Sequence, residues 1–148
     1  MIEANARSIY ADRVSVHKER ARNFLVQCVT YHGQHQPGST LYFVSENEFG
    51  VRGYFIAMLS PFYIVGDMLE ANDVHCYMAD NADKKDFLRM LRAYNEWVDE
   101  NPKVIEAKLS DSDFIKGMER VGLVYERMGY VKTHSVYSRK IDRLENAS

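Results

Sequence analysis

The chain has 148 residues, of which 46% are hydrophobic and 12% aromatic, enough for one sizeable core but too few for two ordinary domains. Its 19 basic residues are balanced by 21 acidic ones, and the formal net charge is -2. No general attraction to nucleic acid or to an anionic membrane is therefore expected. The sequence predicts a single domain over residues 1–148, with a core from about 14 to 141 and a frayed polar tail over 142–148.

Composition also restricts the compartment and the metal chemistry. The longest apolar stretches fall short of the roughly 18 residues that a membrane-spanning helix needs, and the N-terminus lacks the pattern of a secretory signal, so a cytoplasmic location is expected. Cys28 and Cys76 are far apart without CxxC spacing, which favours buried thiols over a disulfide framework. Cys28, His32 and His35 have helical spacing, but Gly33 interrupts the helix and no fourth ligand is evident, so no metal site is predicted.

The first part of the chain predicts a helix followed by a hairpin. Residues from about 14 to 31 carry apolar side chains at three- and four-residue intervals between charged ones, which is typical of an amphipathic helix. Residues 40–45 and 53–59 are aromatic and β-branched and are separated by a polar turn, which predicts two paired strands. Pro61 is expected to end the second strand.

The second part alternates between strands and helices. The predicted elements are a strand at 73–79, a helix at 83–100, a strand at 104–109, a helix from a cap within 111–113 to Gly129, and a strand at 131–141. This mixed order predicts an α/β (α+β) fold, in which helices pack over one central sheet.

Residues 124–130, VYERMGY, resemble the L-Y-E-[KR]-x-G-[FY] signature of the GCN5-related N-acetyltransferases. Four further segments resemble the version of this family that is common in phage genomes: 60–63, 71–73, 108–110 and 133–140. The similarity covers roughly residues 38–141 and agrees with the predicted order of elements. It implies a mixed central sheet with a splayed strand pair and helices on both faces, and an enzyme that transfers an acetyl group from acetyl-CoA to an amine.

The resemblance also implies where acetyl-CoA binds. In that family the cosubstrate lies between the splayed strands, where its pantetheine pairs with main-chain groups that correspond to Tyr77, Met78 and Ala79. The pyrophosphate lies at the start of the next helix, where unpaired N–H groups and the helix dipole attract anions. The corresponding residues are Asn81, Ala82, Asp83, Lys84 and Lys85. Unlike the family's [QR]-x-x-G-x-[GA] pattern, this loop contains no glycine and carries Asp80 and Asp83.

Three residues are candidates for the chemistry. Tyr125 aligns with the family tyrosine that protonates the departing thiolate, and a phenol with a pKa of about 10 carries that proton at neutral pH. Asp73 aligns with a carboxylate that is the general base in some members, and His75, two residues on, is predicted to share its strand face and assist it. Structural roles are the alternative: Tyr125 fits an apolar helix face, Asp73 a strand end, and His75 a packed, hydrogen-bonded position.

The loop without glycine motivates a second hypothesis from another class. The fold is then retained without catalysis, and the protein is a binding or structural module, such as a component of a phage virion that contacts other virion proteins. An inhibitor of a host enzyme is a third hypothesis, for which no specific feature exists. The partner expected for the enzyme is an amine, either a small molecule or a protein. Exposed aromatic residues among Phe49, Phe62 and Tyr63 would favour a homodimer.

Overall fold

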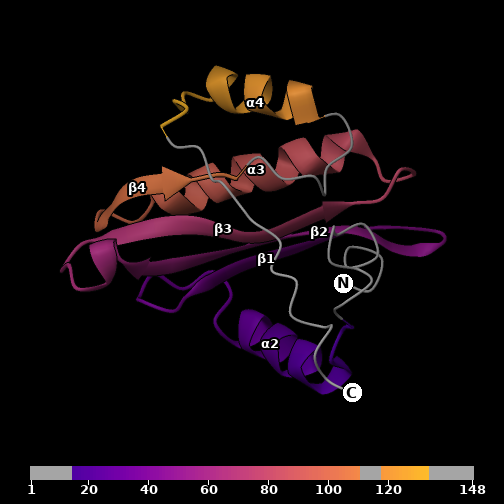
Figure 1. Ribbon diagram of the computed structural model, residues 1–148, viewed down its shortest axis with the longest axis horizontal. Helices are drawn as coiled ribbons and strands as arrows, with labels where there is room; N and C mark the ends of the chain where they lie inside the picture. Colours follow the sequence, from indigo (N-terminus) through magenta and orange to yellow (C-terminus); the bar gives the residue numbers. More distant parts are fainter. Residues whose placement is uncertain (1–14, 111–117, 134–148) are drawn as a thin grey trace, which may run out of the picture.

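The computed structural model of the protein describes residues 15–110 and 118–133. Figure 1 shows α2 (Lys18–Thr30) below the sheet, and α3 (Lys84–Asp99) and α4 (Met118–Arg127) above it. In chain order the elements are α2 (Lys18–Thr30), β1 (Thr40–Asn47), β2 (Gly50–Pro61), the 3₁₀ turn η1 (Phe62–Ile64), β3 (Leu69–Met78), α3 (Lys84–Asp99), β4 (Val104–Lys108) and α4 (Met118–Arg127). The predicted α/β architecture with helices on both faces is confirmed.

The sheet is mixed, with the strand order β1-β2-β3-β4. β1 and β2 form the predicted hairpin and are antiparallel, β2 and β3 are also antiparallel, and β3 and β4 are parallel. Gly50 begins β2 with a φ of 92°, which a residue without a Cβ adopts at no steric cost. Because parallel neighbours need a crossover connection, the chain returns from β3 to β4 through α3.

The helix predicted at 83–100 forms because its apolar side chains share one face. Asp83 is the N-cap, and its side chain accepts a hydrogen bond from the Lys85 N–H. Five side chains of α3 are buried against the sheet: Phe87, Met90, Leu91, Tyr94 and Trp97. They join the larger hydrophobic cluster, which also includes Val121 and Tyr125 of α4. A smaller cluster under α2 contains Cys28, Tyr54, Ile56 and Tyr77.

β4 pairs with only the first part of β3. Their register ends at Asn72 and Lys108, whereas β3 continues to Met78. The Tyr94 hydroxyl of α3 lies 2.9 Å from the Ala71 carbonyl oxygen and 3.1 Å from the Lys108 carbonyl oxygen, and donates to both. One buried side chain thus contacts both strands where their pairing ends. β3 thus extends beyond the end of β4 at the place where the resemblance implies a splayed strand pair, and the splay itself stays a prediction.

A β-bulge in β3 corrects one prediction. Ala57 of β2 pairs with Asp73, whereas the adjacent Ile56 pairs with His75, so Val74 is an extra residue on β3. Cross-strand partners lie on the same face of a sheet. Asp73 therefore shares the α3 face with Ala57, and His75 shares the α2 face with Ile56. The prediction that Asp73 and His75 lie on one face is wrong, because the bulge reverses the alternation between them.

The remaining predicted elements agree in part. β3 begins at Leu69, four residues before the predicted residue 73, so Asp73 lies within the strand and not at its start. α4 ends at Arg127, and Gly129 follows with a φ of 92°, as its predicted role at the helix end requires. The predicted cap at 111–113, most of the strand at 131–141 and the tail lie outside the described residues, and the described residues 131–133 are not in a strand.

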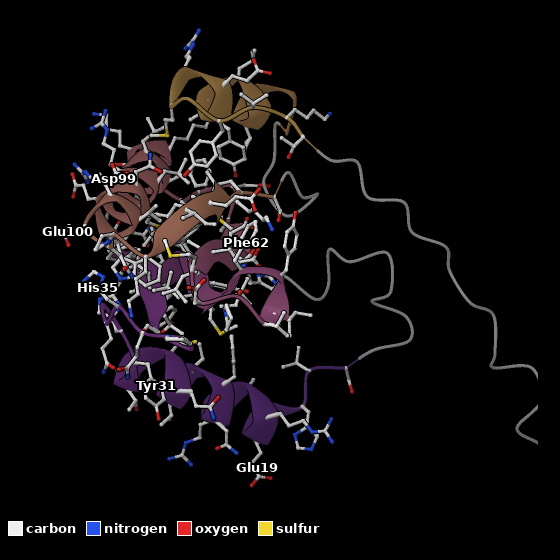
Figure 2. The ribbon with its side chains drawn as sticks, turned by 90° about the vertical axis from the view of Figure 1, so that its left-hand side faces the viewer. Glu19, Tyr31, His35, Phe62, Asp99 and Glu100 are labelled. Carbon is white, nitrogen blue, oxygen red and sulfur yellow. The ribbon has the colours of Figure 1, made fainter. Side chains whose placement is uncertain are left out.

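The exposed apolar side chains include two of the three aromatic residues considered for a homodimer. Phe49 and Tyr63 are exposed, whereas Phe62, labelled in Figure 2, is half-buried. The homodimer stays a prediction. Both cysteines are buried and free, as predicted. Among the described residues, no helix is long and apolar enough to cross a membrane.

Replacing Tyr94 by Phe tests the contact between α3 and the two strands. The ring stays, but two carbonyl oxygens lose their donor, so we expect the free energy of unfolding to fall by about 1–3 kcal/mol in urea denaturation. The matched control is Tyr130→Phe, because the Tyr130 hydroxyl donates to the Asn95 side chain at a half-buried site. The control should lose less. Equal losses in the two variants would show that the Tyr94 hydroxyl has no special role.

Candidate active site

Asp73 is held by the segment that leaves β4. Its carboxylate accepts two hydrogen bonds from Ser110, one from the backbone N–H at 2.8 Å and one from the hydroxyl at 2.7 Å. Each carboxylate oxygen receives one of these bonds. Asp73 is the first residue of β3 beyond its pairing with β4, and Ser110 lies two residues past the end of β4. The carboxylate therefore links the two strands where their main-chain pairing has stopped.

Tyr125 reaches the same point from α4. Its side chain is buried, and its hydroxyl donates to the Ser110 carbonyl oxygen at 3.3 Å. The Tyr130 ring packs beside it, with the ring centroids 6.2 Å apart. Asp73 and Tyr125, which are 52 positions apart in the sequence, are thus joined through one residue. The structure brings together two of the three predicted catalytic side chains.

Burial controls the acidity of Asp73. It raises the pKa of the carboxyl group above its ordinary value of 3.8, and the two hydrogen bonds from Ser110 oppose this rise. The net shift is upward, because desolvation penalises the charged form more than the two donors stabilise it. A carboxylate with a raised pKa is a stronger base than an exposed aspartate, which suits it to accepting a proton.

His75 lies on the other face of the sheet. Its ring packs against the Tyr54 ring at a centroid distance of 5.4 Å, on the side that α2 covers. Burial lowers the pKa of His75 more than the charge of Asp73 raises it, which favours the neutral imidazole. Its aromatic contact and half-buried position agree with the structural alternative, that of a packed histidine.

The three residues predicted to pair with pantetheine differ in the direction of their main-chain N–H and C=O groups. The Ala79 N–H donates to the Arg52 carbonyl oxygen of β2 at 2.7 Å. Hydrogen-bonded pairs alternate along antiparallel strands, so Tyr77 also directs its main chain towards β2. The main-chain groups of Met78, and of Cys76 before it, are directed to the opposite edge, past the end of the β3–β4 pairing. Sequence reasoning missed Cys76, although the two-residue period of a strand would have indicated it.

Two carboxylates of the chain itself lie at the start of α3. Asp83 accepts from the Lys85 N–H at 2.8 Å, and Asp86 in the first turn accepts from the Ser45 hydroxyl at 2.7 Å. Lys84 and Lys85 have exposed side chains, as does Asn81, while Ala82 packs partly buried against the core. An anion bound here would meet the charge of Asp83 and would depend on the two lysines to offset it.

Ser110 is the site residue that sequence reasoning did not assign. It belongs to the segment 108–110 that carries part of the resemblance, but nothing in its own surroundings marks it as a contact of Asp73. Its position directly after a strand was the available signal, because residues at strand ends often carry functional groups. Its contacts with Asp73 and Tyr125 come from β3 and α4, and a local pattern does not show them.

Comparisons with known proteins agree with this architecture. No family model matches the chain, and no curated protein matches it. Among solved structures, the chain is similar to a probable acetyltransferase, with a TM-score of 0.59, 14% identity and coverage of 95% of this chain and 87% of that one. It is also similar to a putative acetyl transferase from Pyrococcus furiosus, with a TM-score of 0.51, 17% identity and coverage of 95% and 91%.

A third similar structure is an aminoglycoside 6'-N-acetyltransferase from Acinetobacter baumannii, with a TM-score of 0.53, 10% identity and coverage of 86% of this chain and 83% of that one. Identities this low show the fold and leave the activity open. The mixed sheet, its helices and these similarities together give the chain the fold of the GCN5-related N-acetyltransferases.

Proposed function

We propose that this protein is an N-acetyltransferase that transfers an acetyl group from acetyl-CoA to an amine. The observation that carries this proposal is the meeting of Asp73 and Tyr125 at Ser110, where β3 and β4 stop pairing. Acyl transfer to an amine needs a base for the proton that the amine loses and an acid for the leaving thiolate. A half-buried carboxylate and a phenol on either side of one residue supply both.

The reaction assigns one proton to each side chain. The amine nitrogen attacks the thioester carbonyl carbon, a C–N bond forms, and the C–S bond breaks. Asp73 takes the proton that the nitrogen loses, and Tyr125 gives its phenolic proton to the thiolate sulfur. The products are the N-acetylated amine and the thiol of CoA. Proton exchange with solvent then returns both side chains to their starting forms. In this proposal His75 is not the base, since it lies on the α2 face.

Strand edges and positive charge in the described part of the chain suit acetyl-CoA. The main-chain groups of Met78 and Cys76 are directed to the edge where the pantetheine amides would lie. Lys84 and Lys85 at the start of α3 would bind the phosphates by their charge, in place of a glycine-rich loop that cradles them. The acceptor is an amine of a small molecule or of a protein.

One observation favours a second candidate function. Because Asp83 caps α3 with its own carboxylate, the N-terminal amides that attract phosphate already face a negative charge. A protein that keeps this fold without binding acetyl-CoA would be a binding or structural module. The resemblance to phage proteins then favours a virion component.

Titration with acetyl-CoA separates the two candidates. We expect calorimetric binding and a rise in Tm, since a ligand at 100 times its Kd adds about 2.7 kcal/mol to the free energy of unfolding. Replacing Lys84 and Lys85 by Gln should weaken the affinity about tenfold, while Arg92→Gln, on an exposed part of the same helix, should leave it unchanged. Asp83→Asn keeps a capping side chain and removes its charge, so it should tighten binding. If millimolar acetyl-CoA produces neither heat nor a Tm shift, the transferase proposal fails and the binding module is favoured.

Tyr125→Phe tests the acid. The ring and its packing remain, and only the hydroxyl that contacts the Ser110 carbonyl is lost. We expect kcat to fall about a hundredfold, with the affinity for acetyl-CoA retained. Release of the CoA thiol in the presence of a panel of aminoglycosides, polyamines and peptide amines measures this. A variant that is within twofold of the unmodified chain would exclude the hydroxyl as the proton donor.

The pH dependence tests the base. Asp73 must be ionised to accept a proton, so kcat/KM should fall as the pH drops through its pKa, and burial places that pKa above 3.8. The fall therefore begins at a higher pH than for an exposed aspartate. Asp73→Asn should lose most of the activity together with this acidic limb. His75→Gln should retain the limb whatever its overall rate, and a limb that disappears only in the His75 variant would assign the base to the imidazole.

A further inference from the structure

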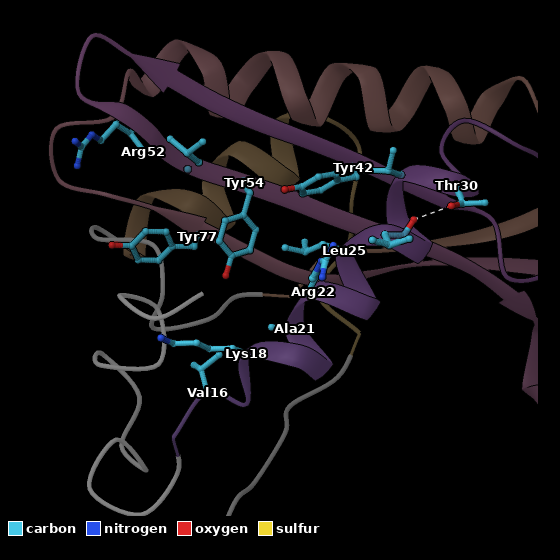
Figure 3. A pocket seen from close by; sticks show the side chains of 14 residues that line it. Val16, Lys18, Ala21, Arg22, Leu25, Thr30, Tyr42, Arg52, Tyr54 and Tyr77 are labelled. Carbon is cyan, nitrogen blue, oxygen red and sulfur yellow. Dashed lines mark hydrogen bonds between the residues drawn. The ribbon is translucent and has the colours of Figure 1, made fainter.

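A groove lies between α2 and the sheet, on the face opposite Asp73 and Tyr125. It has a volume of about 840 Å³, and Figure 3 shows the helix on one side of it and the strands on the other. Its walls are mostly apolar: Leu25, Val26 and Val29 of α2, with Tyr42, Tyr54 and Tyr77 of the sheet. Val26 and Val29 are 56% and 63% exposed, so this side of α2 is not fully covered. The groove has the size and lining of a small-molecule site.

The charged side chains that line the groove in the described part of the chain all have the same sign. Lys18 and Arg22 come from α2 and Arg52 from β2, and no described aspartate or glutamate lines the groove. Glu19, the acidic residue in the first turn of α2, lies on the outer side of the helix in Figure 2. Three cations beside an apolar surface are complementary to a molecule with an acidic head and an apolar body.

The Tyr54 hydroxyl supplies an independent reason to expect a ligand. Tyr54 is only 6% exposed, yet its hydroxyl has no hydrogen-bond partner within the described part of the chain. In Figure 3 this hydroxyl is directed away from the strands, towards the part of α2 that carries Lys18 and Arg22. Burial raises the pKa of Tyr54, so the phenol keeps its proton and is a donor. A buried donor without an acceptor destabilises a protein, and an acceptor atom of a ligand would satisfy it.

We propose that this groove is a second binding site that takes a small amphipathic anion, with a carboxylate or phosphate head and an aliphatic or aromatic body. The head lies near Lys18 and Arg22 and accepts from the Tyr54 hydroxyl, and the body packs between Leu25 and Tyr42. The site is on the other face of the sheet from the transferase residues. The proposal therefore holds or fails independently of the acetyl transfer.

Calorimetric titration of the full chain with three decyl compounds tests the proposal. Decanoate and decyl phosphate carry the acidic head, while decyltrimethylammonium has the same body with a positive charge. We expect saturable binding of one molecule of an anionic probe, weaker at high salt, and no binding of the cationic one. The anionic probe that binds with the higher affinity identifies the head group that the site prefers. Equal binding of all three would mean adsorption to apolar surface and would overturn the proposal. Absence of any binding would also overturn it.

Matched variants locate the probe. Arg22→Gln should weaken binding of the preferred anion about tenfold, while Arg20→Gln, an exposed position on the same helix that does not line the groove, should leave it unchanged. Tyr54→Phe should weaken binding severalfold without lowering the Tm of the ligand-free protein, because the hydroxyl has no partner among the described residues. A lower Tm with unchanged affinity would show that the hydroxyl bonds to the chain itself, and would overturn its assignment to a ligand.

Discussion

The hydroxyl of Tyr94 joins β3 and β4 next to the contact between Asp73 and Ser110. It donates to the Ala71 carbonyl oxygen of β3 and to the Lys108 carbonyl oxygen of β4, at 2.9 and 3.1 Å. A parallel ladder that continued would offer such carbonyls backbone N–H donors from the neighbouring strand. Since the pairing ends here, a side chain of α3 supplies the donor. The helix thus stabilises the end of the pairing, and Asp73 and Ser110 meet directly beyond it.

The bulge at Val74 places Asp73 and His75 of β3 on opposite faces of the sheet. Before it, Asp73 lies on the α3 face, where Ser110 and Tyr125 are within reach. After it, His75 lies on the α2 face and packs against Tyr54, which lines the groove. An unbroken strand would put both residues on one face, and the carboxylate and imidazole would then share one environment. The extra residue thus separates the Asp73 carboxylate from the groove on the α2 face.

Much of the fold follows from periodicity, because an element that buries one face repeats its apolar residues at the period of that element. That is why α3, the hairpin and β4 lie where they were predicted. The start of β3 was missed because its polar residues are satisfied by distant partners. Glu70 contacts the Lys108 ammonium at 2.7 Å, and that contact lowers the pKa of Glu70. In the sequence alone, Glu70 and Asn72 resemble a connection. The bulge and the Ser110 contacts likewise depend on partners that are remote in the sequence. Tyr125 and Asp73 could therefore be predicted from the resemblance, but their shared contact with Ser110 could not.

The structure gives a physical reason for the absence of glycine from the loop before α3. A glycine-rich turn leaves the first amides of a helix open to phosphate, whereas Asp83 satisfies one of them from within the chain. The cap stabilises α3, whose buried face holds the sheet together, and it places a negative charge where a phosphate would bind. Stability of the helix and affinity for a phosphate therefore oppose each other at this position. Lys84 and Lys85 can offset the charge of Asp83 without removing the cap. Binding of acetyl-CoA therefore depends more on the balance of charges at this turn than on the shape of the turn.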